Sequence, residues 1–230
     1  MTAPAVSAVL FDLDDTLYPQ SSFLAGAFDA VAEEAGRLGL DRDRFRRALD
    51  EALSEGSDRG NTIDRALAAL GAPGTDAAVL VKAFHGFVPA RLEPYPGVPA
   101  ALGELGRRVP LGLVTDGHVP GQQAKLEATG LGSHFGVVVF SDEIGRSYRK
   151  PHPAGVAAAL DRLGVPPAEA VLVGDRPDKD VAAALSLGMR AVRVRTGEYA
   201  ARPDLPGTFA SVETVAEAAA LLLPLLAEAD

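Results

Sequence analysis

The sequence contains no cysteine in its 230 residues. This absence excludes disulfide frameworks, thiolate-ligated zinc sites and cysteine nucleophiles. Basic residues are also in deficit, because 22 lysines and arginines stand against 31 aspartates and glutamates, for a formal net charge of −9. Lys and Arg supply the affinity for nucleic-acid backbones, so this balance argues against a nucleic-acid partner. The four lysines are rare enough that a lysine inside a motif is informative.

Long apolar segments are missing as well. The most apolar run, 218–227, is interrupted by Pro224 and is far shorter than the roughly 20 residues that span a bilayer. Residues 1–7 lack the basic and apolar regions of a secretory signal. We therefore expect a soluble cytoplasmic protein without a membrane partner. Its 47% hydrophobic content suffices for a packed core and is too high for a disordered chain.

Short apolar runs and amphipathic segments alternate along most of the chain. The runs are apolar on both alternations, which is typical of strands buried on both faces of a parallel sheet. They cover residues 5–11, 109–114, 137–140, 170–173 and 191–194. Helical periodicity occurs near 98–107, 153–163, 178–187 and 212–226. This alternation predicts an α/β fold with a doubly wound, Rossmann-like parallel sheet.

One interval interrupts the alternation, because almost 100 residues separate the first two predicted strands. No strand pattern occurs in residues 18–92. That stretch predicts helices near 22–38, 43–54, 61–70 and 76–89. We therefore predict an α/β core formed by residues 1–17 and 93–230, with a helical insertion over residues 18–92.

Acidic residues follow several of the predicted strands. Segment 12–16 (Asp-Leu-Asp-Asp-Thr) follows the first strand, 115–117 (Thr-Asp-Gly) the second, and 174–180 the fourth, while Lys150 lies between the third and fourth. Ligand sites of open parallel sheets lie beyond the carboxyl ends of the strands. Carboxylates converging there would repel one another. Mg²⁺ resolves this repulsion, since it binds one or two carboxylates together with substrate phosphate oxygens.

Two of these carboxylates suit phosphoryl transfer. Asp12 could attack phosphorus and form an aspartyl-phosphate, if a cation, an ammonium group and backbone N–H groups offset the like charges. Asp14, two residues later, could protonate the leaving oxygen and then take a proton from the hydrolytic water.

Four ordered segments resemble the motifs of the haloacid dehalogenase-like (HAD) hydrolase superfamily. They are 12–18 (Asp-Leu-Asp-Asp-Thr-Leu-Tyr), 113–117 (Leu-Val-Thr-Asp-Gly), Lys150-Pro151 and 173–180 (Val-Gly-Asp-Arg-Pro-Asp-Lys-Asp). The matching region runs from about residue 6 to residue 197. The position of the insertion, between the first and second motifs, resembles the helical cap of the dehalogenase and small phosphatase branch.

The resemblance implies roles for the acidic residues. Asp12 would be the nucleophile and a Mg²⁺ ligand, and Asp14 the acid/base, with its backbone carbonyl on the metal. Asp175 would be a further metal ligand. Asp180 would support the metal through water or Lys150, and Thr16 would brace the first loop.

The resemblance also implies a phosphate-binding set. It consists of Thr115, the backbone N–H of Asp116, and Lys150, which would also hold the nucleophile. The chain departs from the family pattern at Asp116, where Asn is more usual, and in a longer stretch before Lys150. That longer stretch predicts Arg146 or Arg149 at the mouth of the site.

These observations predict a Mg²⁺-dependent phosphatase that hydrolyses a small phosphorylated metabolite, such as a sugar phosphate or a nucleoside monophosphate. Three alternatives stay open at this point. A phosphomutase would return the phosphoryl group, a dehalogenase would not need Asp14, and a catalytically silent relative would serve as a binding or regulatory domain. The sequence identifies neither the substrate nor the oligomeric state.

Overall fold

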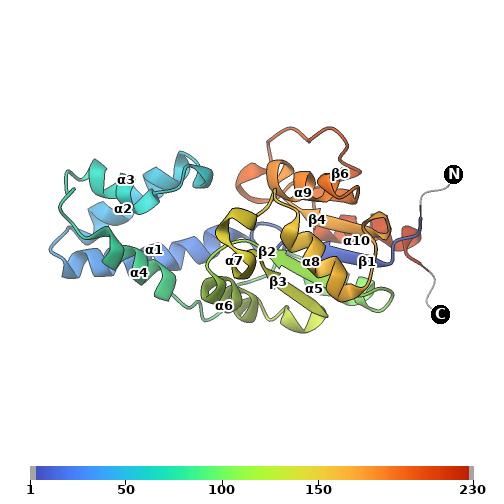
Figure 1. The fold of residues 1–230 in the computed structure, drawn as a ribbon. Helices are drawn as coiled ribbons and strands as arrows, with labels where there is room; N and C mark the ends of the chain where they lie inside the picture. Colours follow the sequence, from blue (N-terminus) through green and yellow to red (C-terminus); the bar gives the residue numbers. More distant parts are fainter. Residues whose placement is uncertain (1–3, 228–230) are drawn as a thin grey trace. The chain divides into compact units, whose positions relative to one another are not determined.

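The computed structural model describes residues 4–227, and this part of the chain forms two compact units (Figure 1). One unit joins the N-terminal segment up to Gln20 to the chain from Arg91 onward. The other consists of Ser21–Ala90. Whether the inserted unit acts as a cap stays a prediction.

The first unit is built on a six-stranded parallel sheet with strand order β3-β2-β1-β4-β5-β6. The strands are β1 (Ala8–Phe11), β2 (Leu111–Thr115), β3 (Val137–Phe140), β4 (Ala170–Gly174), β5 (Arg190–Val194) and β6 (Ala210–Val212). Every residue of β1, β2 and β4 is buried, which explains their uninterrupted apolar sequences. The predicted α/β fold with a parallel sheet is confirmed.

Helices cover both faces of this sheet, as a doubly wound fold requires. They are α5 (Val98–Gly106), α6 (Val119–Thr129), α7 (Ser141–Ile144), α8 (Ala154–Leu163), α9 (Ala182–Ser186) and α10 (Val215–Leu222). Successive residues of β2 face opposite layers. A Cβ on Gly112 would point toward Leu163 of α8, whereas the Leu111 side chain lies against Gly106 of α5. A Cβ on Gly112 would fall 2.5 Å from the Leu10 side chain, so the glycine permits close packing at the centre of the sheet.

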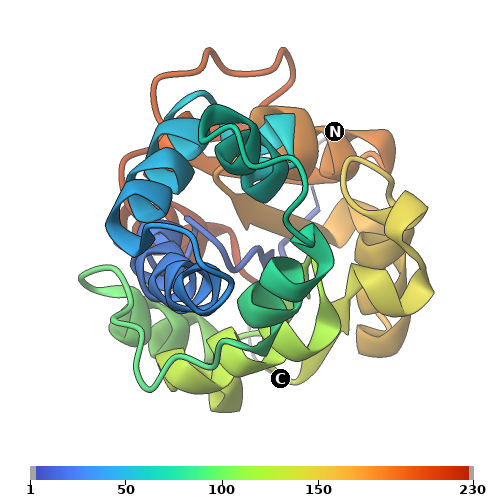
Figure 2. The same cartoon turned by 90° about the vertical axis from the view of Figure 1, so that its left-hand side faces the viewer.

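The second unit contains helices and, within the described residues, no strand, as predicted. Its helices, coloured blue to green in Figure 2, are α1 (Gln20–Arg37), α2 (Arg42–Ser54), α3 (Thr62–Ala69) and α4 (Ala77–Gly86). Asp41 and Asp76 begin two of them, since their carboxylates accept the backbone N–H of Arg44 (2.8 Å) and Ala78 (3.0 Å). Apolar residues such as Phe45 form a separate core.

Helix α6 and strand β6 were not predicted, and two sequence predictions needed correction. The predicted helix 178–187 begins as a wide π-type turn at Pro177–Val181, and α9 follows it. The segment 212–226 is not one helix, because β6 ends at Val212, α10 ends at Leu222, and Pro224 lies in a final 3₁₀ turn. No helix between residues 4 and 227 is long and apolar enough to cross a membrane.

Candidate functional site

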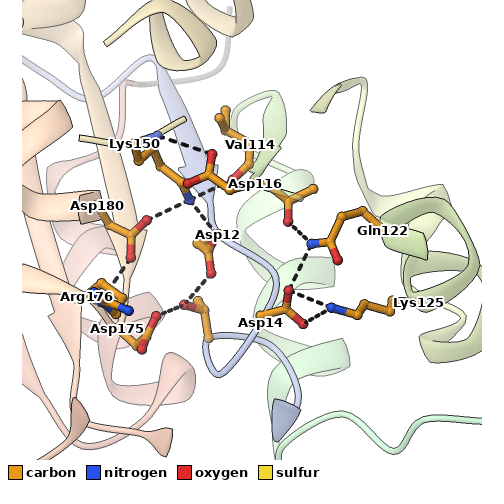
Figure 3. Close-up of polar contacts among 12 residues, drawn as sticks. Asp12, Asp14, Val114, Asp116, Gln122, Lys125, Lys150, Asp175, Arg176 and Asp180 are labelled. Carbon is orange, nitrogen blue, oxygen red and sulfur yellow. Dashed lines mark hydrogen bonds and ion pairs between the residues drawn. The ribbon is translucent and has the colours of Figure 1, made fainter. Parts of the chain in front are cut away.

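The predicted site residues lie at the carboxyl ends of the central strands (Figure 3). Asp12 directly follows β1, Thr115 ends β2, and Asp175 directly follows β4. Lys150 precedes α8, and Asp180 lies in the turn before α9. The strands are parallel, so their carboxyl ends meet at one edge of the sheet, and side chains from distant segments become neighbours there.

Lys150 is the buried cation of this site, with 4% of its surface exposed. Its Nζ lies 2.5 Å from Asp12 Oδ1 and donates to the Val114 carbonyl at 3.0 Å. The same Nζ lies 2.7 Å from Asp180 Oδ1, an ion pair without hydrogen-bond alignment. Burial alone would lower the pKa of Lys150, but the charges of Asp12, Asp180 and Asp116 outweigh burial and raise it well above the ordinary value. Lys150 is therefore a fixed positive charge beside Asp12.

Asp12, Asp175 and Asp180 form a buried carboxylate cluster whose ligand oxygens all lie within 4.8 Å of one another. Burial and the charge of Asp180 together raise the pKa of Asp12 to about 7, against the charge of Lys150, which lowers it. Burial and the charges of Asp180 and Asp12 likewise raise the pKa of Asp175 well above its ordinary value. One ammonium does not compensate three carboxylates. These hard oxygen donors therefore fit a divalent metal ion.

Local backbone contacts hold the cluster in place. Asp180 Oδ2 accepts the backbone N–H of Arg176 at 3.0 Å. A Cβ on Gly174 would lie 2.5 Å from the Asp180 side chain, so a glycine is needed at the end of β4 for this approach. Thr16 Oγ1 lies 3.4 Å from Asp12 Oδ2 and 3.5 Å from Asp175 Oδ1, between the two carboxylates.

Asp14 lies outside this cluster and is turned toward α6 (Figure 3). Lys125 Nζ lies 2.9 Å from both of its carboxylate oxygens, and Gln122 Nε2 donates to Oδ2 at 2.9 Å. The Tyr18 hydroxyl donates to Oδ1. Burial would raise the pKa of Asp14, but the Lys125 charge and these hydrogen bonds together hold it below the ordinary value. Asp14 is therefore an ionised carboxylate, distinct in environment from Asp12.

The predicted phosphate-binding residues of the second motif are also engaged. Thr115 Oγ1 accepts a hydrogen bond from Gln122 Nε2 at 2.5 Å. Asp116 Oδ1 accepts the backbone N–H of Lys150 at 3.2 Å. The Asp116 side chain thus fixes the loop that carries Lys150.

Sequence reasoning missed Gln122 and Lys125. Both are buried on α6 together with Leu126 and Thr129, so three of the four buried side chains of that helix are polar and they give no apolar periodicity. The scarcity of lysine was the signal that could have drawn attention to Lys125. Of the arginines predicted near the site mouth, Arg146 is exposed, and Arg149 makes a bidentate ion pair with Asp142 at 2.6 Å.

Comparisons with known proteins match most of the chain. The family model of the haloacid dehalogenase-like hydrolases matches residues 6–188. A glyceraldehyde 3-phosphate phosphatase of Methanopyrus kandleri is 41% identical over 203 residues, which cover 84% of this chain and 86% of that protein. A phosphoglycolate phosphatase of Rhodospirillum rubrum is 34% identical over 207 residues, which cover 85% of this chain and 82% of that protein.

Solved structures show the same fold. A HAD phosphatase of Thermococcus onnurineus superposes with a TM-score of 0.63 at 28% identity, over 95% of this chain and 98% of that one. A HAD-hydrolase of Bacillus subtilis superposes with a TM-score of 0.75 at 19% identity, over 95% of this chain and 99% of that one. The family match, the fold and the four motif segments lead to one conclusion: the chain belongs to the haloacid dehalogenase-like hydrolases.

Proposed function

We propose that this hydrolase is a Mg²⁺-dependent phosphatase that cleaves a small phosphomonoester through an aspartyl-phosphate on Asp12. The observation that carries the proposal is the separation of two carboxylates. Asp12 contacts a buried lysine inside a cluster suited to a cation, while Asp14 is held apart by donors from α6 and by Tyr18. The relatives named above, which are phosphatases by name, support the same activity.

The cation would be held by the side chains of Asp12 and Asp175 and by the backbone carbonyl of Asp14, with Asp180 as support. When bound, it would neutralise charge on the phosphate oxygens. Lys150 and the turn after β2 supply the rest of the positive potential. The Thr115 hydroxyl, the Asp116 N–H and the Lys150 ammonium would hold the non-bridging oxygens and reduce the repulsion between phosphate and nucleophile.

In the first step a carboxylate oxygen of Asp12 forms a bond to phosphorus, and the bond from phosphorus to the leaving oxygen breaks. For this step Asp14 must first take up a proton, from solvent or from a phosphate monoanion on binding, and it gives that proton to the leaving oxygen, which departs as an alcohol. In the second step Asp14 takes a proton from water, whose oxygen attacks phosphorus and releases inorganic phosphate and free Asp12. The donors around Asp14 favour its ionised form, which is the form that the second step uses.

The inserted residues 18–92 are proposed as a cap that excludes water and contacts the leaving group, with 1–17 and 93–230 as the catalytic core. The two core segments from which the insertion departs are joined to each other. Asp15 Oδ1 accepts the backbone N–H of Gln20 at 2.8 Å, and Tyr95 N–H donates to the Leu17 carbonyl at 2.9 Å.

The names of the relatives narrow the substrate class. Glyceraldehyde 3-phosphate and phosphoglycolate are both short alkyl phosphates with a carbonyl or carboxylate group, so we propose a substrate of this kind, in the cytoplasm. Their alkoxide leaving groups are poor. A proton from Asp14 therefore matters more for them than for an aryl phosphate.

The test is turnover by the purified protein of p-nitrophenyl phosphate, glyceraldehyde 3-phosphate and 2-phosphoglycolate. We expect hydrolysis with Mg²⁺, loss of it with EDTA, and loss by at least about a thousandfold in Asp12→Asn, with an unchanged circular dichroism spectrum. Asp43→Asn, on the exposed surface of α2, is the matched control. Cation-independent turnover, an active Asp12→Asn variant, or turnover of a 2-haloacid in place of phosphomonoesters would contradict the proposal.

A further inference from the structure

The Asp14 carboxylate receives four donor contacts, one of which must give way when Asp14 exchanges a proton with substrate or water. A carboxylate offers about four acceptor positions on its two oxygens. Here Oδ1 receives Lys125 Nζ and the Tyr18 hydroxyl, and Oδ2 receives Lys125 Nζ and Gln122 Nε2. Two of these three donor residues come from one helix that carries none of the family motifs.

Gln122 also connects Asp14 to the phosphate-binding turn. An ionised carboxylate can only accept, so the amide of Gln122 must present its nitrogen to Asp14. The same nitrogen lies 2.5 Å from Thr115 Oγ1, which therefore accepts as well. The hydroxyl hydrogen of Thr115 is then left to donate elsewhere. An anion beside the end of β2 is the partner that the proposed function provides.

Burial of the Lys125 ammonium carries an unfavourable desolvation free energy. Lys125 is 6% exposed, and an ammonium buried to that extent loses much of its hydration. Its distances of 2.9 Å to both oxygens of Asp14 provide the compensation. Removal of the Lys125 charge would leave Asp14 free to turn toward the other cation of the site, Lys150, or toward a metal bound by the carboxylate cluster.

We propose that Lys125 and Gln122 are positioning residues for the reaction. Lys125 keeps the Asp14 carboxylate out of the Asp12–Asp175–Asp180 cluster and in place for proton transfer, and Gln122 in addition orients the Thr115 hydroxyl toward phosphate. The inference rests on the proposed phosphatase function. It differs from the family motifs because it assigns a reaction role to α6.

Lys125→Met tests the first half of the inference. A displacement of about 1 Å of a reacting group can cost roughly a hundredfold in rate. We therefore expect kcat to fall about 10- to 100-fold, with KM changed less than about threefold, because Asp14 does not bind the phosphate. Lys82→Met, an exposed lysine on α4, is the matched control and should retain full activity.

A double-mutant cycle separates positioning from mere support of the fold. If Lys125 acts through Asp14, then Lys125→Met should cost less than about threefold in kcat when Asp14→Asn is already present. The double variant also removes both charges together, so it leaves no unpaired buried ion and keeps the measurement possible if Lys125→Met alone folds poorly. Equal losses of kcat in the two backgrounds would overturn the role of Lys125.

Gln122→Ala tests the second half, against Gln123→Ala as its neighbour on the same helix. Gln123 is exposed and donates to Glu127 at 3.1 Å, so its replacement should change neither kcat nor KM. Gln122→Ala should lower kcat and also raise KM about 3- to 10-fold, because Thr115 loses its orientation. An unchanged KM would overturn the role of Gln122. Absence of any phosphomonoesterase activity in the wild type would instead refute the proposed function itself, so the two failures are distinguishable.

Discussion

Replacement of Lys150 by methionine is the sharpest perturbation of the buried site. The Lys150 ammonium contacts Asp12 at 2.5 Å and Asp180 at 2.7 Å, and the side chain is 4% exposed. Methionine retains most of the aliphatic length and removes the charge. In the absence of added metal, the variant must bury carboxylates beside one another without this cation, and we expect a large loss of stability.

The magnitude follows from the burial of the pair. Removal of one partner of a buried ion pair costs about 3–5 kcal/mol, because the remaining charge is left uncompensated. For a protein of this size each kcal/mol lowers the midpoint of thermal unfolding by about 2–4 °C. In EDTA we therefore expect the midpoint of thermal unfolding of Lys150→Met to lie roughly 6–20 °C below that of the wild type. Added Mg²⁺ should recover part of this decrease, because the cation replaces the missing charge in the carboxylate cluster.

Differential scanning calorimetry is the appropriate assay, because the chain contains two compact units and calorimetry would resolve two transitions if the units unfold separately. The decrease should occur in the transition of the unit that carries the sheet. Lys82→Met, at an exposed position of the helical unit, should shift either transition by no more than about 2 °C. A decrease of less than about 3 °C for Lys150→Met in EDTA would refute the reasoning, since the Lys150 charge would then not compensate the cluster.

Two further predictions concern the loops around the site. The Arg149 hydrogen bonds and the Arg149 charge lower the pKa of Asp142 against burial, which alone would raise it, so the pair stabilises the fold above the unfolded pKa of about 3.9. Asp142→Asn should cost about 1.5–3 kcal/mol at pH 7 in urea unfolding. This difference should vanish as pH falls through the lower folded pKa, and a constant difference down to about pH 2 would contradict the argument. Gly197→Ala would place a Cβ 2.1 Å from Asp15 Cγ, whereas Gly188→Ala, at a similar positive φ, meets nothing within 4 Å. Both variants should lose about 1 kcal/mol of unfolding free energy to backbone strain. Gly197→Ala alone should lose roughly a further 1–3 kcal/mol to the steric clash. Equal losses of unfolding free energy in denaturant unfolding would count against the steric argument.

The fold was largely predictable because its strands are buried on both faces. β1, β2 and β4 have no polar residue before Thr115 at the end of β2, so both of their faces are apolar, which distinguishes them from amphipathic helices. β6 escaped prediction because its three residues are only partly buried and carry no strong apolar pattern. The wide turn at Pro177–Val181 escaped because its spacing imitates the start of a regular helix.

The site was predictable to the extent that it depends on strand ends. The rule that parallel strands deliver ligands at their carboxyl ends brought together Asp12, Thr115 and Asp175, residues far apart in sequence, whereas the role of Lys150, which follows no strand, came from the family resemblance. The environment of Asp14 could not be predicted in this way. Two of its three donor residues come from α6, whose buried face combines Gln122, Lys125 and Thr129 with Leu126, so that helix lacks the continuous apolar stripe by which helices are detected.

The central claim is that the Asp12 carboxylate carries the phosphoryl group. Borohydride reduction of an acid-quenched reaction converts an acyl phosphate to an alcohol, which peptide mass spectrometry locates to a single residue. The account predicts homoserine at position 12 in protein quenched during turnover with Mg²⁺ and a phosphomonoester, and none in protein without substrate. Reduction at another carboxylate, or an unmodified Asp12 in protein quenched during turnover, would contradict it.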